Sequence, residues 1–177
     1  IQYWKWLFGV LQGNFGKSYS LRIPVIQKIG QAFIPTLYLS FLSLFLMCII
    51  SIPVGILAAV KENKWQDYLI RMITFIGMSV PSFWLGLIFL SIFGVQLGLV
   101  SVSGGQTDFV SAILPAFTLA IAMSAKYIRQ IRHVFLEELG KSYVTGARMR
   151  GIRERDILWK HVLPNAMLPI ITLLGIS

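Results

Sequence analysis

Residues 32–60 read AFIPTLYLSFLSLFLMCIISIPVGILAAV, and none of these 29 residues is charged. About 20 apolar residues are enough for a helix to cross the hydrocarbon core of a bilayer. The run therefore predicts a transmembrane helix over 32–60. Pro35 is expected in its first turn and Pro53 in its interior, which neighbouring helices tolerate in a membrane.

The composition of the whole chain agrees with this assignment. Of its 177 residues, 56% are hydrophobic and 13% are charged, whereas a soluble domain is about a quarter charged. A single water-soluble core of this size cannot hide so much apolar surface, so the bilayer is expected to act as the solvent. The single cysteine, Cys48, lies inside the first apolar run and excludes a disulfide framework or a multi-cysteine metal site.

The positive charges mark the connecting loops. The net charge is +9, and nine of the sixteen Lys and Arg residues fall between residues 126 and 160. Nucleic-acid binding is excluded by the long uncharged runs that separate the basic segments. Loops 61–71 and 126–161 are basic, while 98–111 has no Lys or Arg, so the two basic loops are predicted to face the cytoplasm.

The remaining apolar runs complete an all-α polytopic bundle with about four transmembrane segments. A second span is predicted over 68–97 with Pro81 inside it, a third over 111–135, and a fourth from Leu163 onward. Residues 98–109 are expected to form a short loop on the other side. Residues 1–31 carry four cations and several aromatic residues, and they predict an interfacial or extracytoplasmic segment. The chain, 1–177, is interpreted as one membrane domain from the middle of a longer protein.

The long polar loop 137–164 contains the segment 143–164, YVTGARMRGIRERDILWKHVLP. Gly140 and Gly151 are the predicted break points of a short helix, a bend and a second helix. Gly146 and Ala147 are small, so another protein's surface can approach the backbone there. The arginines of this loop suit either anionic lipid or an acidic partner, and both interpretations stay open.

No catalytic or metal site is predicted. Two Gly-Lys-Ser triplets, at 16–18 and 140–142, lack the earlier glycine that a phosphate-binding loop requires. His133 and His161 lie 28 residues apart with no other ligand type nearby, and the six methionines are scattered, which indicates packing. An integral membrane enzyme lacks convergent catalytic groups here, and an ion channel lacks intramembrane charges in residues 32–60 and 72–107.

The spacing within the polar loop carries a family resemblance. Thr145-Gly146-Ala147 is followed after three residues by Gly151, and after nine more by 161–164, His-Val-Leu-Pro. This resembles the E-A-A, three residues, G, nine residues, I-x-L-P loop of the membrane subunits of bacterial ABC importers. Thr145, Gly146 and His161 depart from the Glu, Ala and Ile of that pattern.

Further stretches resemble the permeases of dipeptide, oligopeptide and nickel ABC importers, in order along nearly the whole chain. These stretches are GNFGKS at 13–18, IPTL at 34–37, IPVGILAA at 52–59, SVPSFW at 79–84, ILPA at 113–116 and KHVLPNA at 160–166.

The resemblance implies a non-catalytic membrane permease subunit of a type I importer in the bacterial cytoplasmic membrane. It implies a second, non-identical permease, two ATPase subunits that hold ATP-Mg, and an extracytoplasmic substrate-binding protein, with no cofactor in this chain and no nucleic acid as a partner. The cargo would be peptides or nickel; the alternative is a channel or importer subunit for another small solute. The implied ATPase-coupling residues are Thr145, Gly146, Ala147, Gly151, His161, Leu163 and Pro164.

Overall fold

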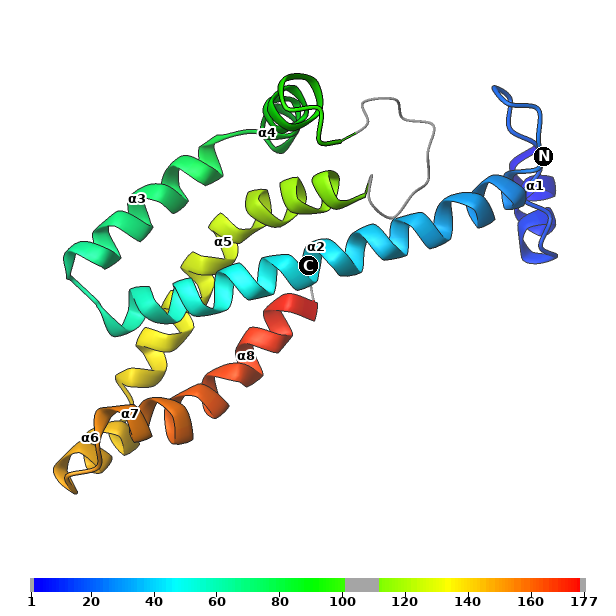
Figure 1. The fold of residues 1–177 in the computed structure, drawn as a ribbon. Helices are drawn as coiled ribbons and strands as arrows, with labels where there is room; N and C mark the ends of the chain where they lie inside the picture. The colour runs from blue at the N-terminus through cyan, green and yellow to red at the C-terminus, as the bar shows by residue number, and fades with distance from the viewer. Residues whose placement is uncertain (1, 101–111, 176–177) are drawn as a thin grey trace.

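The computed structural model describes residues 2–100 and 112–175, and this part of the chain is almost entirely helical (Figure 1). Two π-helical segments, Leu90–Gln96 and Ile157–Val162, continue the helices before them. The α-helices are α1 (Gln2–Leu11), α2 (Val25–Val60), α3 (Trp65–Ser79), α4 (Ser82–Phe89), α5 (Ile113–Leu139), α6 (Ser142–Met149), α7 (Glu154–Asp156) and α8 (Leu163–Gly175).

Helix α2 is the long axis of the molecule, and α5 packs along it. The buried residues of α2 recur every four positions, which places them on one face of a helix; they are Ser43, Met47, Ser51, Gly55 and Ala59, with Ala58 beside them. A Cβ atom on Gly55 would lie 2.7 Å from Cγ2 of Ile131 on α5, so the two backbones approach closely there. Small residues permit this approach in membrane helix pairs.

Helix α2, which contains the first predicted membrane span, is longer than the sequence predicted. It begins at Val25 instead of residue 32, directly after Pro24, and Pro35 lies well inside it instead of in its first turn. Its 36 residues make it about 54 Å long at 1.5 Å per residue. A bilayer core is only about 30 Å thick, so one end of α2 extends beyond the apolar layer.

The predicted span over 68–97 is not one straight helix, because the chain bends at Pro81. Helices Trp65–Ser79 and Ser82–Gln96 meet at an angle of 95°. Proline disfavours the α conformation in the residue before it, and Val80 is accordingly extended, with φ −88° and ψ 124°. The loop predicted over 98–109 falls mostly outside the described residues.

Helix α5 extends further than expected, to Leu139 instead of residue 135, while the predicted start at Ser111 lies outside the described residues. The extension places Glu137 and Glu138 on the helix, because Leu136 and Leu139 still pack against the hydrophobic core. By length and hydropathy, α2 and the helix 154–175 qualify as membrane spans, with the bent pair α3–α4 as a third candidate.

The last helix begins at Glu154, not at Leu163 as predicted, and runs on through Pro164. Proline has no N–H and its ring clashes with the carbonyl four residues earlier. The π-helical segment Ile157–Val162 directly before it relieves this conflict, since the Leu163 N–H bonds the Leu158 carbonyl five residues back.

One buried ion pair fixes the α2–α3 connection to α5. The Asp67 carboxylate is fully buried and accepts two hydrogen bonds of 2.7 Å from the Arg132 guanidinium, a bidentate arrangement. The Asn63 backbone N–H donates a third bond to it, at 3.1 Å. This ion pair therefore holds the start of α3 against α5, through two residues that lie 65 positions apart in the sequence.

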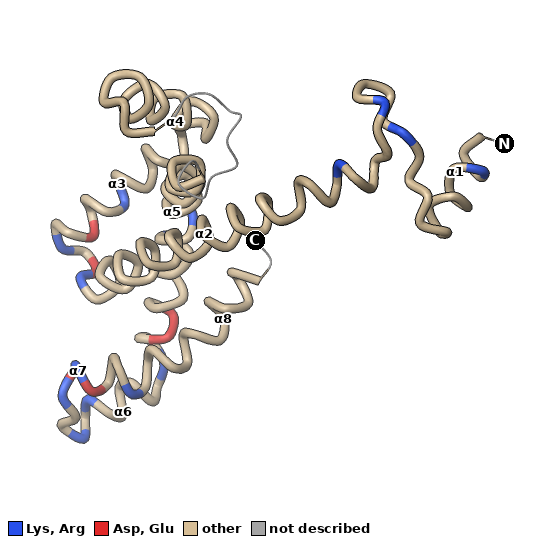
Figure 2. The backbone as a smooth tube through the Cα atoms, turned by 45° about the vertical axis from the view of Figure 1, so that its right-hand side comes forward, with Lys and Arg blue, Asp and Glu red and all other residues tan. Residues whose placement is uncertain are grey.

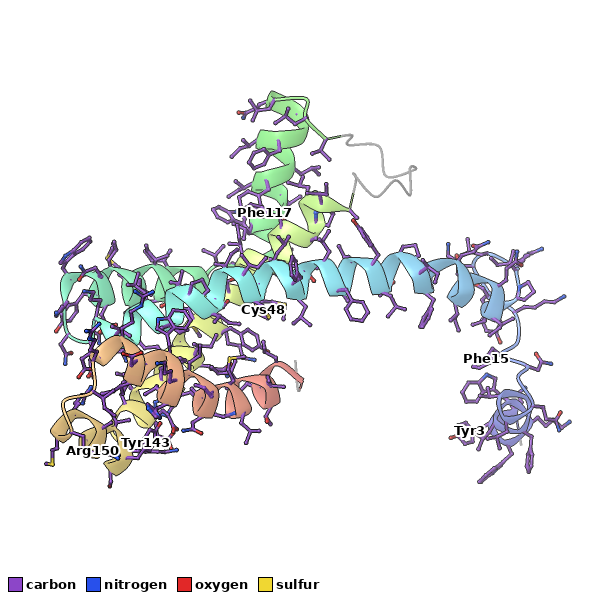
Figure 3. The ribbon with its side chains drawn as sticks, turned by 60° about the horizontal axis from the view of Figure 1, so that its bottom comes forward. Tyr3, Phe15, Cys48, Phe117, Tyr143 and Arg150 are labelled. Atoms are coloured by element: carbon purple, nitrogen blue, oxygen red, sulfur yellow. The ribbon has the colours of Figure 1, made fainter. Side chains whose placement is uncertain are left out.

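The N-terminal segment lies apart from the bundle. Helix α1 buries no residue, and Tyr3, Trp4 and Trp6 are each more than half exposed. Figure 3 labels Tyr3 and Phe15 at the end of the molecule opposite to Tyr143 and Arg150. Figure 2 shows the charged residues gathered toward the two ends, with the middle of α2 free of them. The interfacial or extracytoplasmic location of 1–31 stays a prediction, and residues 25–31 belong to α2.

The close approach of α2 and α5 predicts a position-specific effect of adding one methyl group. Gly55→Ala should destabilise the purified full-length protein by about 1–3 kcal/mol, the usual cost of overpacking, because its Cβ would meet Ile131. Gly30→Ala, in the same helix, adds its methyl to open space and should leave stability unchanged or higher. Thermal unfolding in detergent measures both, and equal midpoints would contradict this packing.

Candidate functional site

The segment 137–164 forms a short helix, a bend and a second helix, as the sequence predicted. Helix α5 ends at its C-cap, Gly140, and α6 occupies Ser142–Met149. Gly151 follows with a positive φ of 72°, and the final helix begins at Glu154. Figure 1 shows α6 and α7 together at one extreme of the molecule, beyond the ends of α3 and α2. We call residues 142–156 the tip.

Backbone hydrogen bonds define the bend at the end of α6. The Gly151 N–H bonds the Arg148 carbonyl at 2.9 Å, and the Ile152 N–H bonds the Ala147 carbonyl at 3.2 Å. This pair of bonds, with a glycine of positive φ between them, is the Schellman arrangement of a helix C-terminus. The need for a left-handed conformation therefore accounts for glycine at position 151 within the chain itself.

A side-chain ion pair spans the same bend. The Arg148 Nε donates to Glu154 Oε1 at 2.7 Å, and its Nη2 donates to Glu154 Oε2 at 3.3 Å. The Glu154 carboxylate raises the pKa of the Arg148 guanidinium. Both side chains are about half exposed, so the pair adds little to stability on its own. Its two-point geometry nevertheless favours one angle between α6 and the helix that follows.

The structure places the predicted coupling residues in two different environments. Gly146 is partly exposed, and a Cβ added there or at Gly151 would meet no atom within 4 Å. Thr145, His161 and Pro164 are also exposed. Ala147 is 3% exposed and packs in the core, and Leu163 is partly buried beside it. Gly146 and Gly151, not Ala147, are therefore the small residues that this chain leaves open to another protein.

The base of the tip is fixed by a polar network that the sequence reasoning missed. Glu138, 5% exposed, accepts a 2.6 Å bond from Lys141 Nζ and a 2.7 Å bond from the Tyr143 hydroxyl. The spacing of Glu138 and Lys141, three residues apart, is the signal that could have indicated the first of these contacts.

This network sets the charge of the buried carboxylate. Burial raises the pKa of the Glu138 carboxyl, but the bonds from Lys141 and Tyr143 outweigh it and hold the pKa below its ordinary value. The Glu138 carboxylate in turn raises the pKa of Lys141. The Glu138 carboxyl is therefore charged and paired at neutral pH, and it joins α5 to α6.

The open side of the tip combines apolar and cationic side chains. Met149 is 83% exposed and Arg150, Arg153 and Arg155 are also exposed, while Trp159, three residues after the tip, is 62% exposed. The interpretation of Met149 as a packing residue is therefore wrong: α6 turns its buried face, Val144 and Ala147, toward the core, and Met149 lies off that face. Large exposed apolar side chains beside cations are typical of a protein-binding surface.

Comparison with known proteins places this geometry in context. Residues 51–177 match the family described as binding-protein-dependent transport system inner membrane component. The chain is 36% identical over all of its 177 residues to the glutathione transport system permease proteins GsiC of Salmonella paratyphi A and Salmonella typhimurium. It is 37% identical over 176 residues, 99% of the chain, to the protein of the same name in Escherichia coli strain K12. The chain spans 57–58% of the length of these relatives.

Two substitutions at Gly151 separate a conformational requirement from a requirement for small size. Asparagine tolerates the left-handed conformation, whereas alanine pays about 1–2 kcal/mol for it. If the conformation matters most, Gly151→Asn should retain more stability than Gly151→Ala, although asparagine is larger. Gly146→Ala, in open space, is the control. Thermal unfolding of the three variants measures this, and an advantage of alanine over asparagine would contradict the conformational role.

Proposed function

The chain belongs to the family of binding-protein-dependent transport system inner membrane components, and from this membership we propose that it is a permease subunit of an ATP-driven importer. The family match and the relatives named permease proteins agree with the resemblance seen in the sequence. They also agree with the all-α membrane fold, and they place the chain among membrane components instead of enzymes.

The observation that carries the coupling role is the tip itself. It lies beyond the bundle and leaves Gly146, Gly151 and Met149 uncovered. We propose that an ATPase subunit binds this surface from the cytoplasm, with Thr145, Gly146 and Gly151 at the contact. The loops 61–71 and 126–161 then face the cytoplasm, as the positive-inside rule favours. A second permease, a second ATPase and an extracytoplasmic binding protein complete the proposed assembly.

The contacts at the base of the tip suggest how movement reaches the membrane. The Schellman bend and the Arg148–Glu154 pair hold α6 at a defined angle to the last helix. The Tyr143–Glu138 hydrogen bond ties α6 to α5, and α6 also packs against the last helix. Displacement of α6 by an ATPase would therefore move the two helices together. If the ATPase closed by ATP binds one position of the tip better than the other, ATP binding shifts the population between two states of the pore.

For the cargo we propose a small peptide. The relatives are named for glutathione transport, and glutathione is a tripeptide. The sequence resemblance implied peptides or nickel, and the relatives support the peptide side of that alternative. Nickel and other small solutes are the rival cargoes that an uptake experiment separates.

The coupling proposal predicts the effect of bulk and charge at the open glycine of α6. Gly146→Glu places a side chain where a Cβ meets nothing within 4 Å, so the fold should remain intact. ATPase co-purification with the full-length complex should fall at least tenfold, because the contact surface is blocked. Lys64→Glu, in the other basic loop, should leave co-purification unchanged. Normal ATPase retention and normal uptake in the Gly146→Glu complex would contradict the coupling role.

The cargo proposal predicts which uptake depends on this subunit. In cells with the intact full-length system, deletion of this subunit should abolish uptake of labelled glutathione or another small peptide and leave labelled nickel uptake unchanged. Restoring the subunit should restore peptide uptake. Loss of nickel uptake alone would identify a metal permease instead, and loss of neither would leave the family assignment standing but refute both cargoes.

A further inference from the structure

A cavity of about 260 Å³ lies between α3 and α5, away from the tip. We call it the α3–α5 cavity; it is lined by Ile70, Arg71, Thr74, Phe75, Met78, Ile128, Arg129 and Arg132. The Asp67–Arg132 ion pair joins the two helices at one end of this region. Farther along, the helices approach again, since a Cβ on Gly77 would lie 3.0 Å from the Cβ of Ala125.

The wall of the cavity carries more positive than negative charge. Arg132 is committed to Asp67 through two 2.7 Å bonds. Arg71 is only 3.5 Å from the same carboxylate, is 42% exposed, and lies over the Tyr68 ring at 4.5 Å. Arg129 is exposed, and its side chain has no ion pair or hydrogen bond within residues 2–100 and 112–175. The lining of the cavity thus contains three guanidinium groups and no carboxylate, and the nearest acidic groups, Asp67 and Glu62, both act on Arg132.

The charged and apolar parts of the cavity lie at different levels. On α3, Phe75 and Met78 follow Arg71 by four and seven residues, which places them about 6 and 10 Å farther along the helix axis. Both are exposed, Phe75 to 73% and Met78 to 44%. A cationic end followed by an open apolar wall fits an amphipathic ligand that has an anionic head and a hydrocarbon chain.

The depth of the cavity in the membrane indicates which such ligand is available. The Asp67–Arg132 pair lies beside the short turn 61–64 that connects α2 and α3. Arg129 precedes Arg132 by three residues on α5, which places it about 4.5 Å along the helix axis away from that turn. Under the topology of the proposed function, this is the headgroup level of the cytoplasmic leaflet. Basic pockets between transmembrane helices on this side are suited to anionic lipid headgroups.

We propose that the α3–α5 cavity binds the phosphate of an anionic phospholipid through Arg129 and Arg71, with an acyl chain lying along Phe75 and Met78. The inference rests on the membrane orientation in the proposed function, but not on the cargo or on the coupling role of the tip.

The test uses the full-length complex with its partner subunits. The complex is reconstituted into nanodiscs that contain phosphatidylglycerol and phosphatidylcholine. Native mass spectrometry measures retained phosphatidylglycerol. Loss of one cation near an anionic surface weakens binding about fivefold, so Arg129→Gln should lower retention about fivefold, and Arg71→Gln combined with it should lower retention further. Arg129→Lys, which keeps the charge, should restore most of it. Lys64→Gln, an exposed cation outside the cavity, is the matched control and should retain lipid normally.

Each alternative occupant has a distinct outcome that would overturn the proposal. Equal lipid retention in the wild type and Arg129→Gln would show that no site exists. Displacement of the lipid by millimolar inorganic phosphate would identify a free-anion site. Unchanged lipid retention together with a selective loss of uptake for acidic cargo would assign the cavity to the translocation pathway. ATPase co-purification is measured on the same samples, so that failure of the complex to assemble is distinguished from failure of lipid binding.

Discussion

The packing of α2 against α5 is the contact on which the other elements depend. Residues at every fourth position of α2 form a narrow buried face in which every side chain except that of Met47 is small, and at Gly55 the helix leaves no room for even a methyl group beside Ile131. In lipid, apolar side chains gain little by leaving the solvent, so close van der Waals contact between helices carries the association. Helix α3, α4 and the last helix each pack on α5, which makes the α2–α5 pair their common support.

Charge is absent from the middle of α2, and carboxylates are paired where they are buried. Asp67 and Glu138 are the buried carboxylates of the described residues, and each is bound by a cation and by a further donor. Removing one partner of such a pair leaves an uncompensated charge, which costs far more than the pair contributes. The two networks therefore specify where the α2–α3 turn and the tip attach to α5, more than they add to stability.

These two attachments separate the molecule into parts with different roles. The tip is small, is attached at Glu138, and is held by backbone bonds at Gly151. The α3–α5 cavity lies on the membrane side of the Asp67 attachment. A partner at the tip and a lipid at the cavity would thus both act on α5, from positions that differ along its length. This arrangement makes α5 the element through which contacts at the two places could influence one another.

The sequence by itself determined the membrane class, the helical fold, the family, and the two glycine break points of segment 137–164, Gly140 and Gly151. Those features depend on long apolar runs, on residues with special backbone freedom, and on fixed spacing, all of which are local. Only the tertiary structure decided that Pro81 bends the second span by 95°, that the last helix begins at Glu154, and that Ala147 is buried while Met149 is exposed. It also decided the pairing of Asp67 with Arg132, because contacts between residues 65 positions apart depend on how whole helices pack and not on local pattern.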